Sequence, residues 1–345
     1  MTKTKLSTLV LIPIFFTLMI TTFVSCDPEE EVDYTALEAT LGDAQQLYDS
    51  SVEGLLAGQY PEGSRATLKS GIDVAEDIRN LDGVTQTEVD NGTTVLQSVI
   101  DAFKLLEIAQ IQADKLVAYY TFTGNANDES GNGFDGVPMA GHIYFGAGDP
   151  PSLTTDRYGN ANGAYHFDRG GNIEVPYNAA LNPEEMTITL WCKKSSSEKL
   201  KTILLALNRS NGYQLQVMSN NKIYSTFRCL DNGQYVFNDD DSGTGYLTND
   251  EWTHVAVSYQ DQEMRFYING VLTNTVGGVN GAIAPADGIA LSIGSDLPTG
   301  TYQESEGDFY VGWGGYFKGD IDDIRIYNQV LPAADVQAIF TMESY

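Results

Sequence analysis

The chain has 345 residues, of which 42% are hydrophobic, and it carries 47 acidic against 19 basic side chains for a formal net charge of −28. This length suffices for two domains, and this hydrophobic fraction is ordinary for globular proteins. Nucleic acids are bound through clustered cations that release counterions, so such an acidic chain argues against a nucleic-acid partner. The 34 glycines and 20 tyrosines indicate many turns and half-buried strand positions, and therefore a mainly β body.

The first 26 residues have the pattern of an export signal. Lys3 and Lys5 precede an apolar run from Leu9 to Val24, which predicts the charged and hydrophobic regions of a signal peptide. The run ends in FVSC, which resembles the lipobox of bacterial lipoproteins. That resemblance implies cleavage before Cys26, lipidation of Cys26 and a mature chain that begins there. An uncleaved membrane-anchoring helix is the alternative, because the run is nearly long enough to span.

An acidic tract, DPEEE, follows Cys26 and predicts a short tether over residues 27–32. The tract resembles the export signal of surface lipoproteins in Bacteroidetes. The two resemblances together imply a protein that is lipid-anchored in the outer membrane and exposed on the cell surface.

Residues 33–114 show helical periodicity and predict a small three-helix bundle. Apolar side chains recur at spacings of three and four in three sets, which are Leu37, Leu41, Ala44, Leu47 and Tyr48; Leu68, Ile72, Ala75 and Ile78; and Val95, Val99, Ala102, Phe103 and Leu106. Thr85 with Glu88 predicts a capping box before the third helix. The segments GQYP, TLKSGIDVAEDI and TQTEVDNGTTVLQSVIDAF resemble the FIVAR module of extracellular bacterial proteins. We expect a spacer that lifts the next domain off the membrane, with an independent sugar site as the alternative.

At Leu116 the periodicity changes from helical to alternating, so we assign residues 116–345 to a second domain. The predicted strands are LVAYYTF, AYHFD, NIEVP, MTITLWCK, TILLAL, YQLQVMS, KIYSTFRCL, WTHVAVSYQ, MRFYING, IALSIGS, FYVG and IDDIRIY. Short polar turns join them, including the pair Asn269-Gly270, which is a strong hairpin signal. Many short strands of this kind predict an antiparallel two-sheet sandwich.

The motifs of this domain, in order, are YYTF, SGNG, AYHFD, MTITLW, EWTHVAVSYQDQEMRFYING and FKGDIDDIRIYNQVLPAADV. In that order they resemble the LamG-like concanavalin A family of jelly rolls. The resemblance implies a concanavalin A-like fold and a mainly non-catalytic module, commonly carbohydrate-binding or adhesive, which in many members holds a structural calcium ion. The fold alone fixes no ligand.

The family pattern places a calcium site between the last strand and the loop after the first strand, which here means Asp322 and Asp128. Backbone carbonyls from the loop or from the turn FDRGG would complete the oxygen shell that Ca²⁺ needs. Strand alternation predicts Asp322 on the core face with Ile324, and Asp323 on the other face with Arg325. In the alternative, Asp322 accepts backbone N–H groups or pairs with an arginine such as Arg325, and Asp128 makes an Asx-turn.

A second acidic run, NDDDSGTG at residues 238–245, lacks the spacing of an EF-hand loop. We predict that it forms a solvated hairpin tip.

A sugar site needs an exposed aromatic face and a few orienting polar groups. Trp313 lies between glycines in SEGDFYVGWGGYFKG, so a loop could present its ring to a ligand. Its predicted companions are Tyr302, Asp308, Tyr310 and Tyr316. Trp191 and Trp252 fall in core motifs of the family and are expected to be structural. The alternative for the loop is that its aromatic rings fold back onto the sandwich edge.

No catalytic motif stands out in the sequence. Glucanase jelly rolls carry alternating strand acids, E-x-D-x-E or E-x-D-x-x-E, and the nearest segment, ESEGD at residues 304–308, has the wrong order. His142, His166 and His254 show no zinc spacing, and His254 is expected to be a satisfied core residue. Cys192 and Cys229 are too few for a disulfide framework, which leaves one bridge or two buried thiols open.

These features predict a cell-surface lipoprotein whose LamG-like module binds glycan during polysaccharide capture. An adhesin or assembly subunit that binds a protein partner is one alternative. A glycoside hydrolase with unrecognised acids is the other.

Overall fold

The computed structural model describes residues 32–54, 58–197, 202–286, 288–302 and 315–344. The predicted lipidation residue Cys26 and the predicted ligand residues Asp308, Tyr310 and Trp313 lie outside these ranges. Contacts divide the described chain into two compact units, residues 32–49 with 68–101 and residues 50–67 with 102–344. Among the described helices, none combines the length and the apolar character needed to cross a bilayer.

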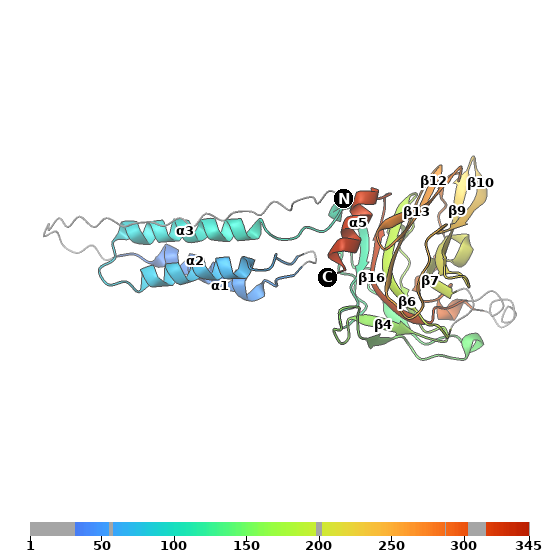
Figure 1. Ribbon diagram of the computed structural model, residues 1–345, viewed down its shortest axis with the longest axis horizontal. Coiled ribbons are helices and arrows are strands. Elements are labelled where there is room, and N and C mark those ends of the chain that lie inside the picture. Colours follow the sequence, from blue (N-terminus) through green and yellow to red (C-terminus); the bar gives the residue numbers. More distant parts are fainter. Residues whose placement is uncertain (1–31, 55–57, 198–201, 287, 303–314, 345) are drawn as a thin grey trace, which may run out of the picture. The chain divides into compact units, whose positions relative to one another are not determined.

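Three helices precede the strands, as predicted (Figure 1). They are α1 Thr35–Ser50, α2 Ser64–Arg79 and α3 Gln86–Lys104. The predicted stripes of α1 and α2 are buried at Leu37, Leu41, Ala44, Leu68, Ile72 and Ala75. The capping box before α3 is confirmed, because the Thr85 N–H donates to Glu88 Oε2 at 2.8 Å and the Glu88 N–H donates to Thr85 Oγ1 at 3.4 Å.

The buried stripe of α3 differs from the predicted one. Its buried members are Val89, Leu96, Ile100 and Phe103. The predicted core position Val95 is 55% exposed and was assigned to the wrong face, and Leu106, 44% exposed, lies beyond the end of α3 at Lys104. Gly92 explains the error, because a Cβ there would lie 2.7 Å from Ile78 Cδ1. A glycine in the buried stripe allows close helix packing, but it has no apolar side chain and is therefore not recognised when apolar residues are used to find the buried face.

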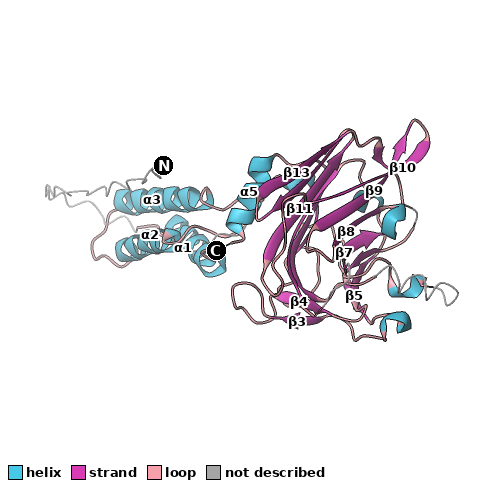
Figure 2. Cartoon of the chain, turned by 45° about the vertical axis from the view of Figure 1, so that its right-hand side comes forward, coloured by secondary structure: helices cyan, strands magenta, loops and turns pink. Residues whose placement is uncertain are grey.

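Within the described ranges the strands form two antiparallel sheets of eight strands each, which confirms the predicted sandwich. The first sheet has the order β13-β12-β11-β6-β16-β4-β3, with β1 paired to β16. Its strands are β1 Leu116–Tyr120, β3 Ser152–Thr154, β4 Ala164–Phe167, β6 Met186–Lys194, β11 Thr253–Gln260, β12 Glu263–Ile268, β13 Val271–Gly277 and β16 Gly319–Tyr327. Figure 2 shows its long strands as one layer of the sandwich.

The second sheet has the order β10-β9-β8-β7-β15-β5-β2, with β14 paired to β9. Its strands are β2 Val137–Met139, β5 Asn172–Val175, β7 Thr202–Leu207, β8 Tyr213–Val217, β9 Ile223–Asp231, β10 Gln234–Asp241, β14 Ala282–Ile283 and β15 Leu291–Ile293. The main core lies between the sheets and includes Ile188, Val257, Phe227 and Leu215.

The helix α5, Ala333–Met342, covers the outer face of the first sheet (Figures 1 and 2). Val336 and Ile339 of α5 pack with Tyr119, Ala256 and Tyr267 in a second buried cluster. The predicted strand IDDIRIY is confirmed as part of β16, and Pro332 stands immediately before α5.

The acidic run at residues 238–245 was placed wrongly, because residues 238–241 form the second half of β10. The β9–β10 turn lies at Asn232 and Gly233, whose φ angles are +46° and +77°. Aspartate is unfavourable in most strands, but β10 is an edge strand, where charge deters pairing with other chains. A hydrogen bond also holds the second half of β10 in place, since the Asn238 side-chain amide donates to the Tyr259 hydroxyl at 2.8 Å.

Candidate functional site

The predicted calcium ligand Asp322 lies in a buried ion-pair network at the end of α5. Its Oδ2 accepts a hydrogen bond from Arg157 Nη1 at 2.6 Å, and its Oδ1 accepts the N–H of Asp323 at 2.9 Å. Asp323 Oδ2 accepts from Arg157 Nη2, also at 2.6 Å. The main-chain oxygen of Glu343 accepts from Arg157 Nε at 2.7 Å. We call Arg157, Asp322, Asp323 and Glu343 the clasp.

The predicted orientation of Asp322 is wrong. The β16 register is irregular between Asp322 and Arg325, and Asp323 has a φ of +43°. This left-handed residue breaks the alternation, as in a β-bulge. Ile321 and Ile324 therefore both face the main core, and Asp322 and Asp323 both face Arg157.

The charged side chains of the clasp are almost completely buried from solvent. The ion-paired side chains of Arg157, Asp322 and Asp323 are 5%, 3% and 7% exposed. Burial and the neighbouring charge of Asp323 raise the pKa of Asp322 well above its usual value, and Arg157 opposes this shift. Arg325 pairs with the Glu343 carboxylate, which also accepts from Trp191 Nε1 at 2.7 Å. The residue after α5 is thereby tied to the sheet.

Asp128, the other predicted calcium ligand, organises its own loop. Its Oδ1 accepts the N–H groups of Tyr119 and Ser130 at 2.9 and 3.0 Å. Its Oδ2 accepts from Ser130 Oγ at 2.8 Å and from the N–H of Phe134 at 3.0 Å. Its bond to the Ser130 N–H forms the Asx-turn that was predicted as the alternative to calcium binding.

These two carboxylates, as described, do not fit a calcium ion. Their oxygens face hydrogen-bond donors, and beside Asp322 the positive charge comes from Arg157. No group of three acidic, histidine or cysteine side chains within the described ranges could hold a metal. Asp322 pairs with an arginine, as in the alternative, but this arginine is Arg157 and not the example Arg325. Calcium binding by this protein stays a prediction from the resemblance.

The predicted ligand residues Tyr302 and Tyr316 meet at one end of the sandwich. Both rings contact Phe145, with centroid distances of 5.3 and 5.2 Å. Tyr302 is only 8% exposed, and its hydroxyl binds Asp296 and, at 3.0 Å, Ser295 Oγ. The described part of this loop thus packs on the sandwich edge, and Tyr302 serves as a hydrogen-bond donor to a buried carboxylate.

Asp296 and Arg209 form a buried ion pair in this cluster, which the sequence did not suggest. Burial raises the pKa of Asp296, while Arg209 and the Tyr302 hydroxyl oppose the rise. The sequence also gave no reason to join Phe145 to this loop, because Phe145 belongs to a short 3₁₀ turn far from it in the chain.

The most exposed aromatic pair of the described sandwich strands lies on β10 and was missed from sequence. Tyr235 and Phe237 are 57% and 53% exposed and share one face of the strand. Val236 and Asn238 point the other way, toward the core. On β9, Arg228 stands opposite Phe237, and its Cζ lies 3.5 Å from the Tyr235 ring centroid. We call Tyr235, Phe237 and Arg228 the β10 face. The alternation Y-V-F after the Asn232-Gly233 turn was the signal that could have revealed it.

A sequence model described as the Concanavalin A-like lectin/glucanases superfamily matches residues 167–337. Most strands of both sheets fall within this segment. The sandwich belongs to this superfamily.

The other similarities of the chain are distant or cover a small part of it. Domain 4 of AbnA, a GH43 extracellular arabinanase from Geobacillus stearothermophilus, is 19% identical with a TM-score of 0.48, over 65% of this chain and 97% of that one. The binding domain of Paraclostridial Mosquitocidal Protein 1 is 15% identical with a TM-score of 0.47, over 67% of this chain and 52% of that one. A gellan lyase from Bacillus sp is 36% identical over 84 residues, which are 24% of this chain and 3% of the lyase.

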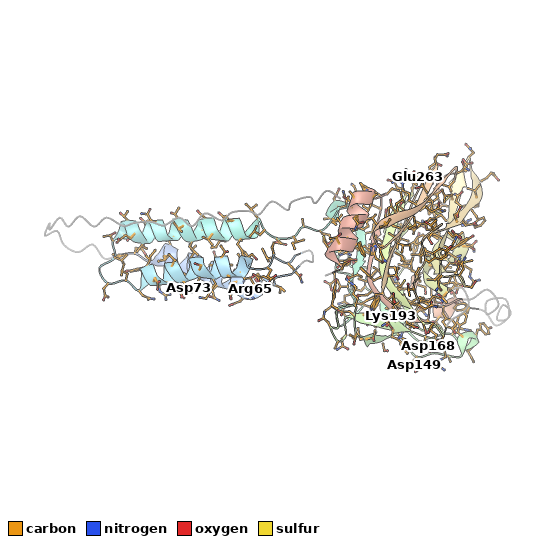
Figure 3. All side chains as sticks on the ribbon, viewed as in Figure 1. Arg65, Asp73, Asp149, Asp168, Lys193 and Glu263 are labelled. Atoms are coloured by element: carbon orange, nitrogen blue, oxygen red, sulfur yellow. The ribbon has the colours of Figure 1, made fainter. Side chains whose placement is uncertain are left out.

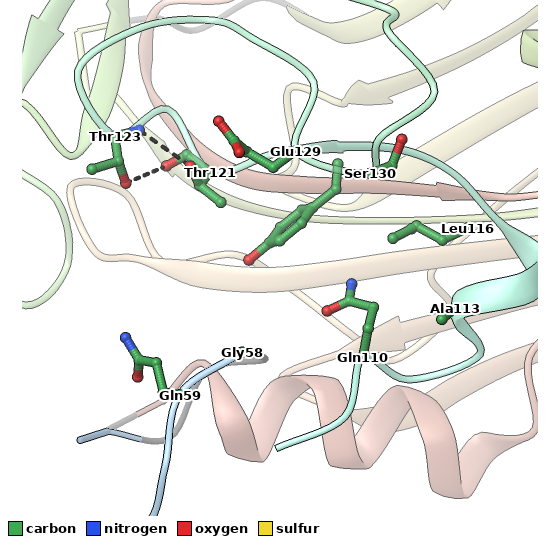
Figure 4. Close-up of a pocket in the computed structure, with 10 residues that line it drawn as sticks. Gly58, Gln59, Gln110, Ala113, Leu116, Thr121, Thr123, Glu129 and Ser130 are labelled. Carbon is green, nitrogen blue, oxygen red and sulfur yellow. Dashed lines mark hydrogen bonds between the residues drawn. The ribbon is translucent and has the colours of Figure 1, made fainter. Parts of the chain in front are cut away.

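A pocket of about 610 Å³ lies in the larger unit, beside the first strand of the concanavalin A-like sandwich (Figure 4). Its lining includes Gln59, Gln110, Thr121, Glu129 and Ser130. Loops form most of the pocket. Glu129 supplies the single carboxylate of the lining residues, and none of the other lining residues is acidic or basic. We assign no ligand to it.

Proposed function

We propose that the concanavalin A-like sandwich is a non-catalytic carbohydrate-binding module and that the β10 face is its contact surface. The observation that carries this proposal is the exposure of two aromatic rings, 57% and 53%, on one face of one strand. Exposed rings pack on the apolar side of a pyranose, and neighbouring polar groups orient the hydroxyls. Arg228, 3.5 Å from the Tyr235 ring, is such a polar neighbour.

The setting that we propose follows from the sequence. Lipidation of Cys26 would anchor the chain in the outer membrane, and the helices would hold the sandwich away from the bilayer. A module presented in this way is suited to the capture of polysaccharide at the cell surface. The loop with Trp313, Tyr310 and Asp308 stays a predicted second contact.

Affinity electrophoresis of the mature chain against a panel of soluble polysaccharides tests the β10 face. The panel includes gellan, because of the 84-residue similarity to a gellan lyase. Replacing Tyr235 or Phe237 by alanine should weaken binding about tenfold, the effect of losing one aromatic contact of about 1.4 kcal/mol. Tyr177→Ala is the matched control, since Tyr177 is also exposed but follows β5.

The outcomes separate the two proposed contacts. Loss of binding in the Tyr235 and Phe237 variants alone supports the β10 face. Loss only in Trp313→Ala would move the site to the aromatic loop, and equal binding by all variants would contradict both assignments. Release of reducing or unsaturated ends from any polysaccharide would show that the module is an enzyme.

A protein partner is the second candidate, and one observation favours it. β10 is an edge strand, and Leu230, 43% exposed, extends the apolar surface beside Tyr235. The aspartates of β10 are confined to residues 239–241, so the uncharged first half of this edge strand can take a strand from a partner. Binding to the partner that persists in saturating free oligosaccharide would favour this candidate over a glycan.

A further inference from the structure

His166, Asp320 and Lys193 form a row across three strands of the first sheet. Asp320 on β16 pairs with His166 on β4 on one side and with Lys193 on β6 on the other. Their neighbours Phe167, Ile321 and Cys192 belong to the main core. Strand alternation therefore places the row on the outer face of this sheet, which is not the sheet that carries the β10 face.

In this row the Asp320 carboxylate is buried, whereas the two basic side chains, His166 and Lys193, reach the surface. Asp320 Oδ1 is 2.6 Å from His166 Nδ1, and Asp320 Oδ2 is 2.6 Å from Lys193 Nζ. The Asp320 side chain is 8% exposed, against 47% for His166 and 33% for Lys193. Because Asp320 occupies Nδ1, the other imidazole nitrogen, Nε2, is the atom that a ligand would meet.

The charges of the row do not cancel when His166 is protonated. Burial alone would raise the pKa of Asp320, but its bonds to His166 and Lys193 hold that pKa below its usual value. The hydrogen bond to Asp320 raises the pKa of His166. Two cations then share one anion, which leaves one positive charge at the surface of a chain whose net charge is −28.

Other charges near the row are already paired or bonded. Lys318 Nζ lies 3.5 Å from Asp168 Oδ1, and Asp250 Oδ1 accepts the N–H of Ser196 at 3.0 Å. Asp168 follows β4 directly. Figure 3 labels Lys193 and Asp168, which mark this part of the sandwich.

An aromatic ring and a hydroxyl flank the row. Lys193 Nζ lies 5.2 Å from the centroid of the Trp252 ring, which is half-buried. At the other side, exposed Ser152 on the edge strand β3 stands opposite His166. A cation beside an aromatic ring fits a sugar that carries a carboxylate, because the ring packs on the pyranose and the cation pairs with the acid.

We propose that His166, Lys193 and Trp252 form a binding site for an acidic sugar residue. The sugar ring lies against Trp252, and its carboxylate is held by Lys193 Nζ and His166 Nε2. The buried Asp320 carboxylate pairs with both basic side chains and holds them in position. This site shares no residue with the β10 face, so it stands or falls separately from the proposed function.

Calorimetric titration of the mature chain with the trimer of galacturonic acid, and with the methyl ester of that trimer, tests the site. The ester keeps the sugar rings but removes the charge. We expect the acid to bind at least about tenfold more tightly than the ester, the effect of one charge-assisted contact. Equal affinity for the two, or no binding of the acid, would overturn the proposal without any variant.

Variants then locate the contact. Lys193→Gln and His166→Gln should each weaken binding of the acid about tenfold and leave the ester unaffected. Asp320 keeps one partner in each variant, and circular dichroism checks the fold. Arg265→Gln on β12, which breaks a half-buried pair with Glu263, should bind the acid as the natural chain does. Wild-type affinity in both Lys193→Gln and His166→Gln would refute the site.

The pH profile separates charge from packing. His166 faces Asp320 on β16, Lys193 on β6 and Asp168 after β4. Affinity for the acid should fall as the pH rises through the pKa of His166, which the hydrogen bond to Asp320 raises above its usual value. That fall should be absent in His166→Gln. An identical profile in His166→Gln would show that the imidazole does not take part.

Discussion

Arg157 and Asp322 lie 165 residues apart in the chain and meet in a 2.6 Å ion pair with side chains that are 5% and 3% exposed. Arg157 also binds Asp323 and the main-chain oxygen of Glu343. One guanidinium therefore joins the loop after β3, the bulge of β16 and the end of α5. This geometry uses the planar, forked donor set of arginine.

Arg157→Ala should lower the free energy of unfolding by about 3–5 kcal/mol, because it leaves buried carboxylates without a counter-charge. Arg157→Lys should recover only part of this loss, since an ammonium cannot form the fork. Arg169→Ala is the control, because Arg169 is 54% exposed and should cost less than about 0.5 kcal/mol. Urea unfolding measures all three. A cost for Arg157→Ala as small as the control would show that the clasp contributes nothing.

The sequence predicted much of the fold and less of the site, for a physical reason. Periodicity and turns are local, so the three helices, most strands and the final helix were predictable from nearby residues. The Asp323 bulge was not, because nothing in the letters IDDI marks a left-handed residue. Arg157 and Phe145 reach their partners only through the folded sheets. The strand β10 was missed in part because its aspartates resemble a turn, and tertiary pairing with β9 overrides that preference.

Removal of divalent cations tests the calcium prediction. The oxygens of Asp128 and Asp322 already accept hydrogen bonds, so we expect equal melting temperatures in excess EDTA and in millimolar Ca²⁺. A ligand that binds only the folded state at about 100 times its Kd would add about 2.7 kcal/mol of stability. A higher melting temperature in Ca²⁺, lost in Asp322→Asn, would instead show that calcium displaces Arg157 from this site.

Tyr302→Phe tests whether Tyr302 is structural. Its hydroxyl donates to Asp296, a buried carboxylate with a raised pKa. Removing a donor from a buried acceptor costs about 1–3 kcal/mol, so we expect a loss of that size in urea unfolding and unchanged glycan affinity. Tyr177→Phe, at an exposed tyrosine, should change neither quantity. Lower glycan affinity in Tyr302→Phe with unchanged stability would assign Tyr302 to the ligand.

His254 predicts a dependence of stability on pH. Its side chain is fully buried between Trp191 and Phe340, with ring centroids at 5.5 and 5.8 Å. In the described structure neither ring nitrogen has a hydrogen-bond partner, so the expected satisfied histidine is buried but unsatisfied. Burial, and then the charges of Arg325 and Arg157, lower the pKa of His254 to about 3.

The difference in proton uptake between the unfolded and the folded chain decides whether stability rises or falls with pH. Between about pH 6.5 and about pH 3 the unfolded chain protonates this imidazole and the folded chain does not, so stability is lost as the pH falls. The raised pKa of Asp322 acts in the opposite direction, and the natural chain alone therefore cannot reveal the effect of His254. The difference between the natural chain and His254→Phe can, because both contain Asp322.

We expect this difference in unfolding free energy to move in favour of His254→Phe by about 1.4 kcal/mol per pH unit below about pH 6.5. Urea unfolding at several pH values measures it. His166→Gln provides the contrast, since the raised pKa of His166 adds stability below about pH 6.5 that is lost as the pH rises. A difference between the natural chain and His254→Phe that stays constant with pH would mean that His254 takes up its proton in the folded state.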